Sequence, residues 1–161
     1  LDEFFATGTY RPRSRTQTVA TSSPSMDVSK ASNLERLVFD LLGRDPSQTA
    51  QAWEDLGTDG FLNLTPHHTR FARELRFESG TSTHSDRLQT IRTVFKAAGA
   101  MVDPHTADGI GVARPLVEDG VRMLVLETAK PQKFAETMVE ALGIEPEMTL
   151  RDVSMMQAPQ R

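Results

Sequence analysis

Thr128 is the hydroxyl residue of this chain best placed to touch a ligand, because an apolar run precedes it and a helix is predicted after it. Residues 123–126 are all apolar, which indicates a short buried strand. Pro131 suits the first turn of a helix, and apolar residues then recur every four positions up to Gly143. Ligands of open α/β sheets bind at the carboxyl ends of strands, where Thr128 would lie. The spacing by itself favours a plainer role, in which Thr128 only caps the turn.

A second group of polar residues, Ser32, Asn33 and Arg36, lies at the start of a predicted helix over residues 33–42. Apolar residues recur along this helix at helical spacing, and Gly43 ends it. Free N–H groups and the helix dipole attract anions to a helix N-terminus, so these side chains could bind a phosphate group. On spacing alone, an ordinary N-cap followed by a surface arginine is the favoured interpretation.

Other residues of types common in active sites are interpreted as structural. His67 and His68 are neighbours on a predicted helix, where side chains point about 100° apart and do not easily share a metal ion, so no metal site is expected. Lys96 would need a desolvated pocket to form a Schiff base, and it occupies an ordinary helix-face position. Gly109 and Gly111 lack the third glycine of a dinucleotide-binding fingerprint.

The elements that must position these residues are mostly helical, with few strands in an α/β architecture. Helices are predicted to begin near Asn33, Asp45, Thr65, Ser85 or Asp86, His105 or Thr106, and Pro131. The strand over residues 123–126 needs a partner strand. Either residues 16–20 or a part of the protein outside this chain would supply it.

Composition narrows the class of protein. The chain has 161 residues, 38% of them hydrophobic, which is lean for a globular domain. Its net charge of −4 gives no overall attraction to nucleic acid or anionic membranes, and without cysteine it has neither disulfides nor a thiolate metal site. No apolar run approaches the length of a membrane span, and the start, Leu-Asp-Glu-Phe-Phe, resembles neither a signal peptide nor an initiation site. We expect a piece of a longer cytoplasmic protein.

Four blocks of sequence resemble motifs of threonine synthases, in the same order. The family patterns are Ser-Pro-Ser-Met-Asp, Ser-Asn-Phe-Glu-Arg-Leu, Asp-Pro-His-Thr-Ala-x-Gly and Thr-Ala-His-Pro-x-Lys-Phe. The matching blocks are residues 23–27 (SPSMD), 32–37 (SNLERL), 103–109 (DPHTADG) and 128–134 (TAKPQKF). Lys130 stands where the family has His, which puts a role of that position in proton transfer in doubt.

The resemblance implies a pyridoxal-phosphate enzyme of fold type II, the tryptophan-synthase-β-like fold. Threonine synthases convert O-phospho-L-homoserine and water into L-threonine and phosphate. In this fold type a Ser or Thr hydroxyl bonds the pyridine nitrogen of the cofactor, and the matching position is Thr128. The resemblance also makes Ser32, Asn33 and Arg36 candidates for the substrate phosphate. His105 and Thr106 match a motif without an evident chemical step, so they are expected either to line the site or to serve the core or a helix cap.

Two parts that the family chemistry needs are not found in this chain. The Schiff-base lysine of the family is followed by Asp, and none of Lys30, Lys96, Lys130 and Lys133 is. The Gly- and Asn-rich loop that holds the cofactor phosphate is missing as well. Residues 1–148 are therefore expected to form the C-terminal part of the catalytic domain, inactive without the N-terminal part, and residues 149–161 a loosely held tail.

A helical protein-interaction domain without catalytic activity is the alternative function. It would use the lean core and an exposed sheet face to dock a partner chain. The two hypotheses differ at Thr128, which in the enzyme would line a cleft together with Asn33 and His105. In the interaction domain these three residues need not converge.

Overall fold

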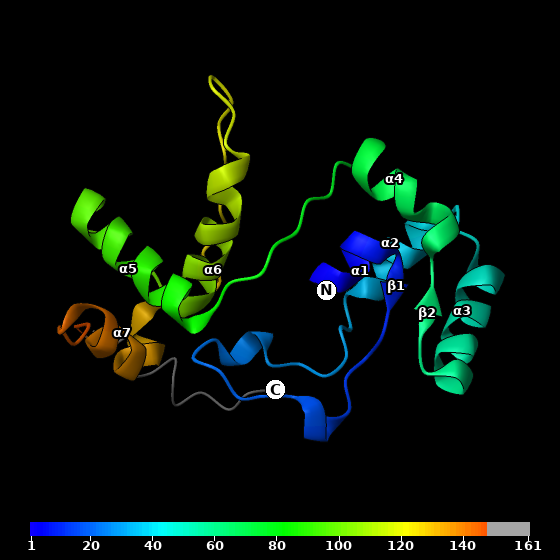
Figure 1. Cartoon of the computed structure of the whole chain (residues 1–161), viewed down its shortest axis with the longest axis horizontal. Helices are drawn as coiled ribbons and strands as arrows, with labels where there is room; N and C mark the ends of the chain where they lie inside the picture. Colours follow the sequence, from blue (N-terminus) through cyan, green and yellow to red (C-terminus); the bar gives the residue numbers. More distant parts are fainter. Residues whose placement is uncertain (148–161) are drawn as a thin grey trace. The chain divides into compact units, whose positions relative to one another are not determined.

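The computed structural model describes residues 1–147, which fold as two compact units (Figure 1). Unit 1 contains Leu1–Val19 and Asp27–Gly80, and unit 2 contains Ala20–Met26 and the chain from Thr81 onward. The tail predicted over residues 149–161 lies outside the described residues. Along residues 1–147, no helix is both long and apolar enough to cross a membrane.

Unit 1 consists of short helices around one small antiparallel ladder. Its helices and strands are α1 (Asp2–Thr7), β1 (Thr9–Tyr10), the 3-10 helix η1 (Arg15–Gln17), α2 (Leu34–Leu41), α3 (Pro46–Asp59), β2 (Leu62–Asn63), the 3-10 helix η3 (Thr65–His67) and α4 (His68–Arg73). Strands β1 and β2 pair with Thr9 opposite Asn63 and Tyr10 opposite Leu62.

Gly8 is required where α1 turns into β1. Its φ is +75°, a conformation that L side chains rarely adopt, and a Cβ there would lie 2.9 Å from the Cα of Thr65. The close approach lets the N–H of Leu64 donate to the carbonyl of Gly8 at 2.8 Å. The glycine therefore both ends α1 and admits the returning chain that forms β2.

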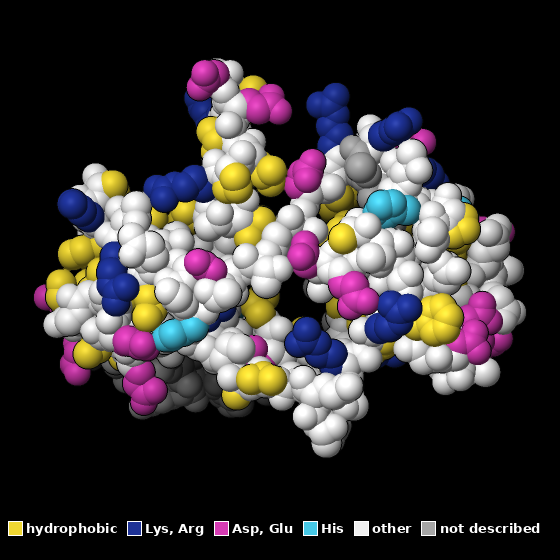
Figure 2. All heavy atoms as spheres, in the orientation of Figure 1, with side chains coloured by type: hydrophobic (Ala, Val, Ile, Leu, Met, Phe, Trp, Pro, Cys, Tyr) yellow, Lys and Arg dark blue, Asp and Glu magenta, His cyan; other side chains and the backbone are white. Residues whose placement is uncertain are grey.

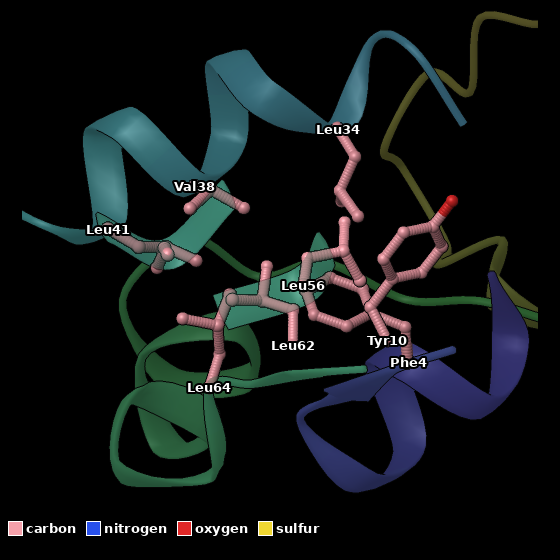
Figure 3. Close-up of a cluster of buried hydrophobic side chains, with 9 residues drawn as sticks. Phe4, Tyr10, Leu34, Val38, Leu41, Leu56, Leu62 and Leu64 are labelled. Carbon is pink, nitrogen blue, oxygen red and sulfur yellow. The ribbon is translucent and has the colours of Figure 1, made fainter. Parts of the chain in front are cut away.

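The core of unit 1 is hydrocarbon and aromatic (Figure 3). Val38 and Leu41 of α2 are 0% and 1% exposed, and they follow one another at helical spacing on the buried face. The complete cluster is Phe4, Tyr10, Leu34, Val38, Leu41, Ala52, Leu56, Leu62 and Leu64. The apolar stripe predicted for residues 33–42 is thus confirmed as the face that fills this core.

The described part of unit 2 packs three α-helices together. Its elements are the 3-10 helix η2 (Pro24–Met26), α5 (His84–Ala98), α6 (Pro104–Ala113), the 3-10 helices η4 (Arg114–Leu116) and η5 (Pro131–Phe134), and α7 (Ala135–Leu142). Their apolar core is small and contains Leu88, Ile91, Ala107, Met138 and Ala141.

Local capping decides where the helices of unit 2 begin. Thr83 and Asp86 form a reciprocal capping box, so α5 begins at His84, one residue before the earlier of the two predicted starts. Asp103 caps α6, which begins at Pro104 rather than at His105 or Thr106. The predicted helix after Pro131 is confirmed, with its first turn drawn into a 3-10 helix.

The strand predicted over residues 123–126 is wrong for the described chain. Residues 121–128 form no helix or strand, and no strand forms over residues 16–20 either. Leu124 and Leu126 are 78% and 81% exposed. A strand exists only through hydrogen bonds to a neighbour, and no other described segment pairs with this one. The apolar run by itself could not decide this, because it does not show whether a partner is present.

Candidate functional site

The three predicted phosphate ligands lie together in unit 1. Ser32, Asn33 and Arg36 line one open hollow of about 410 Å³ at the start of α2, together with Glu35, Phe39 and Thr49. Asn33 is the N-cap residue of α2, and its side chain makes no capping hydrogen bond. Its amide is therefore not committed to the helix.

The groups that line this hollow suit an anion bound beside the start of α2 and Arg36, away from Glu35. The N–H groups of the first turn of α2 and the guanidinium of Arg36 are donors, and both favour phosphate or carboxylate oxygens. Glu35 is the one acidic residue on the lining, and it opposes a second negative charge. Thr49 donates to the carbonyl of Asp45 at 2.8 Å, so its hydroxyl already has a partner.

Thr128 of unit 2 is exposed at the end of residues 121–128, which form no helix or strand. The N-cap residue of η5 is Lys130, in extended conformation, and Thr128 lies two residues before it. Among the described residues, none makes a hydrogen bond to its hydroxyl. The hydroxyl is therefore available to a ligand, while the predicted convergence of Thr128 and His105 with Asn33 joins residues of two units and stays a prediction.

His105 and Thr106 are buried at the start of α6, and both bond to the carboxylate of Asp103. The Nδ1 atom of His105 lies 2.8 Å from Asp103 Oδ1, and the Thr106 hydroxyl donates to Oδ2. The backbone N–H of His105 also donates to Oδ1, at 3.0 Å. On its other side the imidazole Nε2 lies 3.0 Å from the backbone nitrogen of Ser25, and the ring of Phe134 packs edge-on at 4.8 Å between centroids. These contacts serve a helix cap and a packed core.

A buried ion pair of unit 2 was not foreseen from the sequence. Arg87 of α5 is 4% exposed and bonds both carboxylate oxygens of Asp108 in α6, at 2.9 and 3.0 Å. The two residues are 21 positions apart, so no helical spacing joins them. No local signal could have revealed the pair, because only the packing of α5 on α6 brings it together.

The segment 121–126 runs beside α6 with alternate side chains turned outward. Gly109 makes room for it, because a Cβ at that position would lie 3.3 Å from Cγ1 of Val125. Val125 is 37% exposed, about half as much as its neighbours Leu124 and Leu126. Figure 2 shows hydrophobic side chains at the surface of unit 2 in the region where this segment lies in Figure 1. The segment has the alternation of a strand with one face packed and the other bare.

Comparisons with known proteins agree with these observations. Residues 106–161 match the family model described as "Threonine synthase, C-terminal". The chain is 48% identical, over its full length, to a threonine synthase of Methylobacillus glycogenes and covers 34% of that protein. It is 47% identical over 99% of its length to a threonine synthase of Corynebacterium glutamicum, again covering 34% of the relative.

Solved structures show the same fold. A pyridoxal-phosphate-bound threonine synthase from Brucella melitensis superposes with a TM-score of 0.84 and 32% identity, over 99% of this chain and 33% of that one. The yeast threonine synthase gives a TM-score of 0.76 at 26% identity, over 94% of this chain and 32% of that one. The chain thus spans about a third of the length of the relatives it matches. By sequence along its whole length and by fold, the chain belongs to the threonine synthase family and corresponds to a C-terminal part of its members.

Proposed function

We propose that this chain is the C-terminal part of a cytoplasmic, pyridoxal-phosphate-dependent threonine synthase. The whole enzyme is a lyase of threonine biosynthesis that converts O-phospho-L-homoserine and water into L-threonine and phosphate. The observation that carries the proposal is 48% identity to a threonine synthase along the entire chain, with the motif residues retained in order. The non-catalytic interaction domain is not favoured by these matches.

The residues of this chain suit the pyridine ring of the cofactor, but not its aldehyde or its phosphate. Pyridoxal phosphate supplies an electron sink for the substrate carbons when it is bound. The free hydroxyl of Thr128 suits the pyridine nitrogen, which needs a hydrogen-bonding partner but no charge. The four lysines, Lys30, Lys96, Lys130 and Lys133, are all exposed, whereas a Schiff-base lysine needs desolvation. The anchoring lysine and the loop for the cofactor phosphate are therefore assigned to the N-terminal part of the enzyme.

Ser32, Asn33 and Arg36 are assigned to the phosphate of O-phospho-L-homoserine. Their shared hollow at the start of α2 supports this role, because it combines a helix N-terminus, an uncommitted amide and a guanidinium. Arg36 would hold the phosphate bidentately, and Ser32 and Asn33 would orient it. Of the two roles expected for His105 and Thr106, lining the site or serving the core or a helix cap, we assign them to the start of α6, where both bond Asp103.

The exposed segment 121–126 supports docking of the N-terminal part of the enzyme. A strand of that part would pair with its backbone and cover the outward side chains of Leu124 and Leu126. Burying two leucine side chains contributes about 1.5–3 kcal/mol each. This arrangement would place Thr128 at the end of a completed strand.

The proposal is tested by reassembly. The 161-residue chain is mixed with the separately prepared N-terminal two-thirds of a threonine synthase and with pyridoxal phosphate, and threonine and phosphate release are measured. Activity is expected only in the mixture. Thr128→Val should lower the turnover by about one to two orders of magnitude, because it leaves a buried ring nitrogen without its partner. Thr69→Val, at an exposed position of α4, is the matched control and should leave turnover unchanged.

A direct binding measurement distinguishes failure of the two parts to associate from lack of activity in the assembled complex. Analytical ultracentrifugation shows whether the two parts associate. A stable complex without activity would contradict the proposed function. Within an active complex, Arg36→Met should raise KM for O-phospho-L-homoserine about tenfold to a hundredfold, as expected for loss of a charged hydrogen bond. Arg73→Met, exposed on α4, is the matched control.

A further inference from the structure

Residues 20–26 form a strap that belongs to unit 2, although the chain on both sides of it belongs to unit 1. Within unit 1, hydrogen bonds join the chain that precedes the strap to the chain that follows it. The hydroxyls of Thr18 and Ser29 lie 2.7 Å apart, and the N–H of Arg13 donates to the carbonyl of Ser29 at 3.0 Å. These contacts hold the two ends of the loop close together on either side of the strap. The path of residues 20–26 between them therefore depends on the contacts that the strap itself makes.

One fastening of the strap is an imidazole that acts as an acceptor. The backbone N–H of Ser25 points at Nε2 of His105 at 3.0 Å, and an N–H can bond only to a nitrogen that carries a lone pair. The proton of the neutral ring therefore sits on Nδ1, which donates it to Asp103 at 2.8 Å. His105 is 8% exposed, so water does not readily replace Nε2 as the acceptor.

A second contact that holds the strap is the hydrogen bond from the guanidinium of Arg87 to Ser22. Nη1 of Arg87 donates to the hydroxyl of Ser22 at 2.6 Å, while Asp108 holds the same guanidinium in place. Nδ1 of His84 lies 2.7 Å from the Ser22 hydroxyl, and its Nε2 lies 2.9 Å from Glu140 in α7. A guanidinium stays protonated at every pH at which proteins fold, so Arg87 keeps Ser22 whatever the state of His84.

We propose that two fastenings of the strap respond differently to acid: Arg87 holds Ser22 throughout the pH range in which unit 2 stays folded, whereas His105 holds Ser25 only while its imidazole is neutral. Protonation places a hydrogen on Nε2, where it meets the N–H of Ser25 head-on, and an imidazolium has no acceptor left. The charged group that faces His105 among the described residues is Asp103. Phe134, packed from η5, carries no charge. Acid therefore detaches the η2 turn while the Ser22 end stays bound.

The state of each histidine can be read directly by NMR. The chain has four histidines, so single substitutions assign their imidazole ¹⁵N signals. At neutral pH, His105 should show the Nδ1-protonated tautomer and the Ser25 amide proton should lie downfield. As His105 titrates, the Ser25 amide should move upfield with the same midpoint. The protection factors of the Ser25 and Met26 amides, each referred to the intrinsic exchange rate at the same pH, should fall at least about tenfold. The hydrogen bond from Arg87 to Ser22 should persist.

Substitutions distinguish loss of the hydrogen bond between Ser25 and His105 from acid unfolding of the whole chain. His105→Gln keeps an acceptor oxygen near the position of Nε2 without a titrating group, so Ser25 should stay protected across the same pH range. His67→Gln in unit 1 is the matched control, and the Ser25 titration should be unchanged in it. The proposal is overturned by an Nε2-protonated tautomer at neutral pH, or by a Ser25 amide that does not respond while His105 titrates. It is overturned equally if His105 stays neutral until the whole chain unfolds, or if the His105→Gln variant keeps the wild-type midpoint.

Discussion

The interiors of the two units differ in the kind of side chain that fills them. Unit 1 is closed by aliphatic and aromatic groups contributed by α1, α2, α3 and the β1–β2 ladder, as Figure 3 shows. Unit 2 has a smaller apolar cluster and a set of buried polar groups. These polar groups, all buried in unit 2, are Ser23, Arg87, Asp103, His105, Thr106, Asp108 and Thr137.

The two kinds of interior should respond differently to substitution. Hydrocarbon packing is non-directional, so the cost of a substitution in unit 1 scales with the volume removed. Buried charges and hydrogen bonds are directional, and removing one partner leaves the other unsolvated and unpaired. Unit 2 should therefore be sensitive to changes that preserve volume, and unit 1 should not.

The sharpest test of the comparison is Arg87→Met. The side chains of Arg87 and Asp108 are 5% and 11% exposed, so the remaining carboxylate would be buried without a counter-charge. We expect a loss of about 3–5 kcal/mol in the free energy of unfolding, confined to unit 2. Urea denaturation followed by NMR signals of α5 and α6 measures it. The double variant Arg87→Met/Asp108→Leu should recover most of the loss, and equal stability of the single and double variants would contradict the polar account of unit 2.

The corresponding change in unit 1 is Leu41→Ala, at a side chain 1% exposed. The cavity and the lost burial should cost about 2–5 kcal/mol. Trp53 is the single tryptophan and packs against the unit 1 core, so its fluorescence reports this unit. Leu41→Met, which nearly preserves volume, should cost less than about 1.5 kcal/mol. A large loss in both variants would show that unit 1 is as demanding as unit 2.

A smaller effect is expected where the exposed segment meets α6. Gly109→Ala improves helix propensity by about 1 kcal/mol, but its Cβ would lie 3.3 Å from Val125 Cγ1. We expect little net change in stability and a displacement of the segment, visible as a shift of the Val125 methyl signals. Gly111→Ala is the matched control, because the nearest atom there is the hydroxyl oxygen of Thr90, at 3.4 Å. An unmoved Val125 in the Gly109 variant would show that the segment does not pack on α6.

The smallest effect should be alike in both units, because it lies at exposed helix ends. The side-chain hydrogen bond from Gln48 lowers the pKa of Asp45, and the hydrogen bond from Thr83 lowers that of Asp86, both below the ordinary 3.8. A carboxyl group whose pKa is lower in the folded state than in the unfolded state stabilises the fold when the pH is above its unfolded-state pKa. This stabilisation is lost as the pH falls through the folded-state pKa. The first turns of α3 and α5 should therefore fray together below about pH 4.

Amide signals of Ser47 and of Asp86 follow this fraying. Asp45→Asn and Asp86→Asn should remove the acid dependence at their own helix only, since an amide oxygen still accepts but does not titrate. Fraying of one helix at a clearly higher pH than the other would show that the contrast between the units extends to their surfaces.

The sequence predicted the helices well because their signals are local. Pro46 and Pro131 mark first turns, and glycines in the left-handed conformation end α3, α5 and α7. The candidate phosphate residues share one helix start, so their proximity followed from spacing. The starts of α5 and α6 were misplaced by one or two residues, because a capping side chain can be recognised only once its backbone partner is known.

The sequence alone determined the family, through motifs in a fixed order, and the positions of most helices, through caps and apolar spacing that act within a few residues. Tertiary structure decided everything that depends on a distant partner. It paired Thr9 and Tyr10 with residues near 62, joined Arg87 to Asp108, and brought the N–H of Ser25 to Nε2 of His105, 80 positions away. It also left residues 123–126 without a strand, because pairing needs a neighbour that the described chain does not provide.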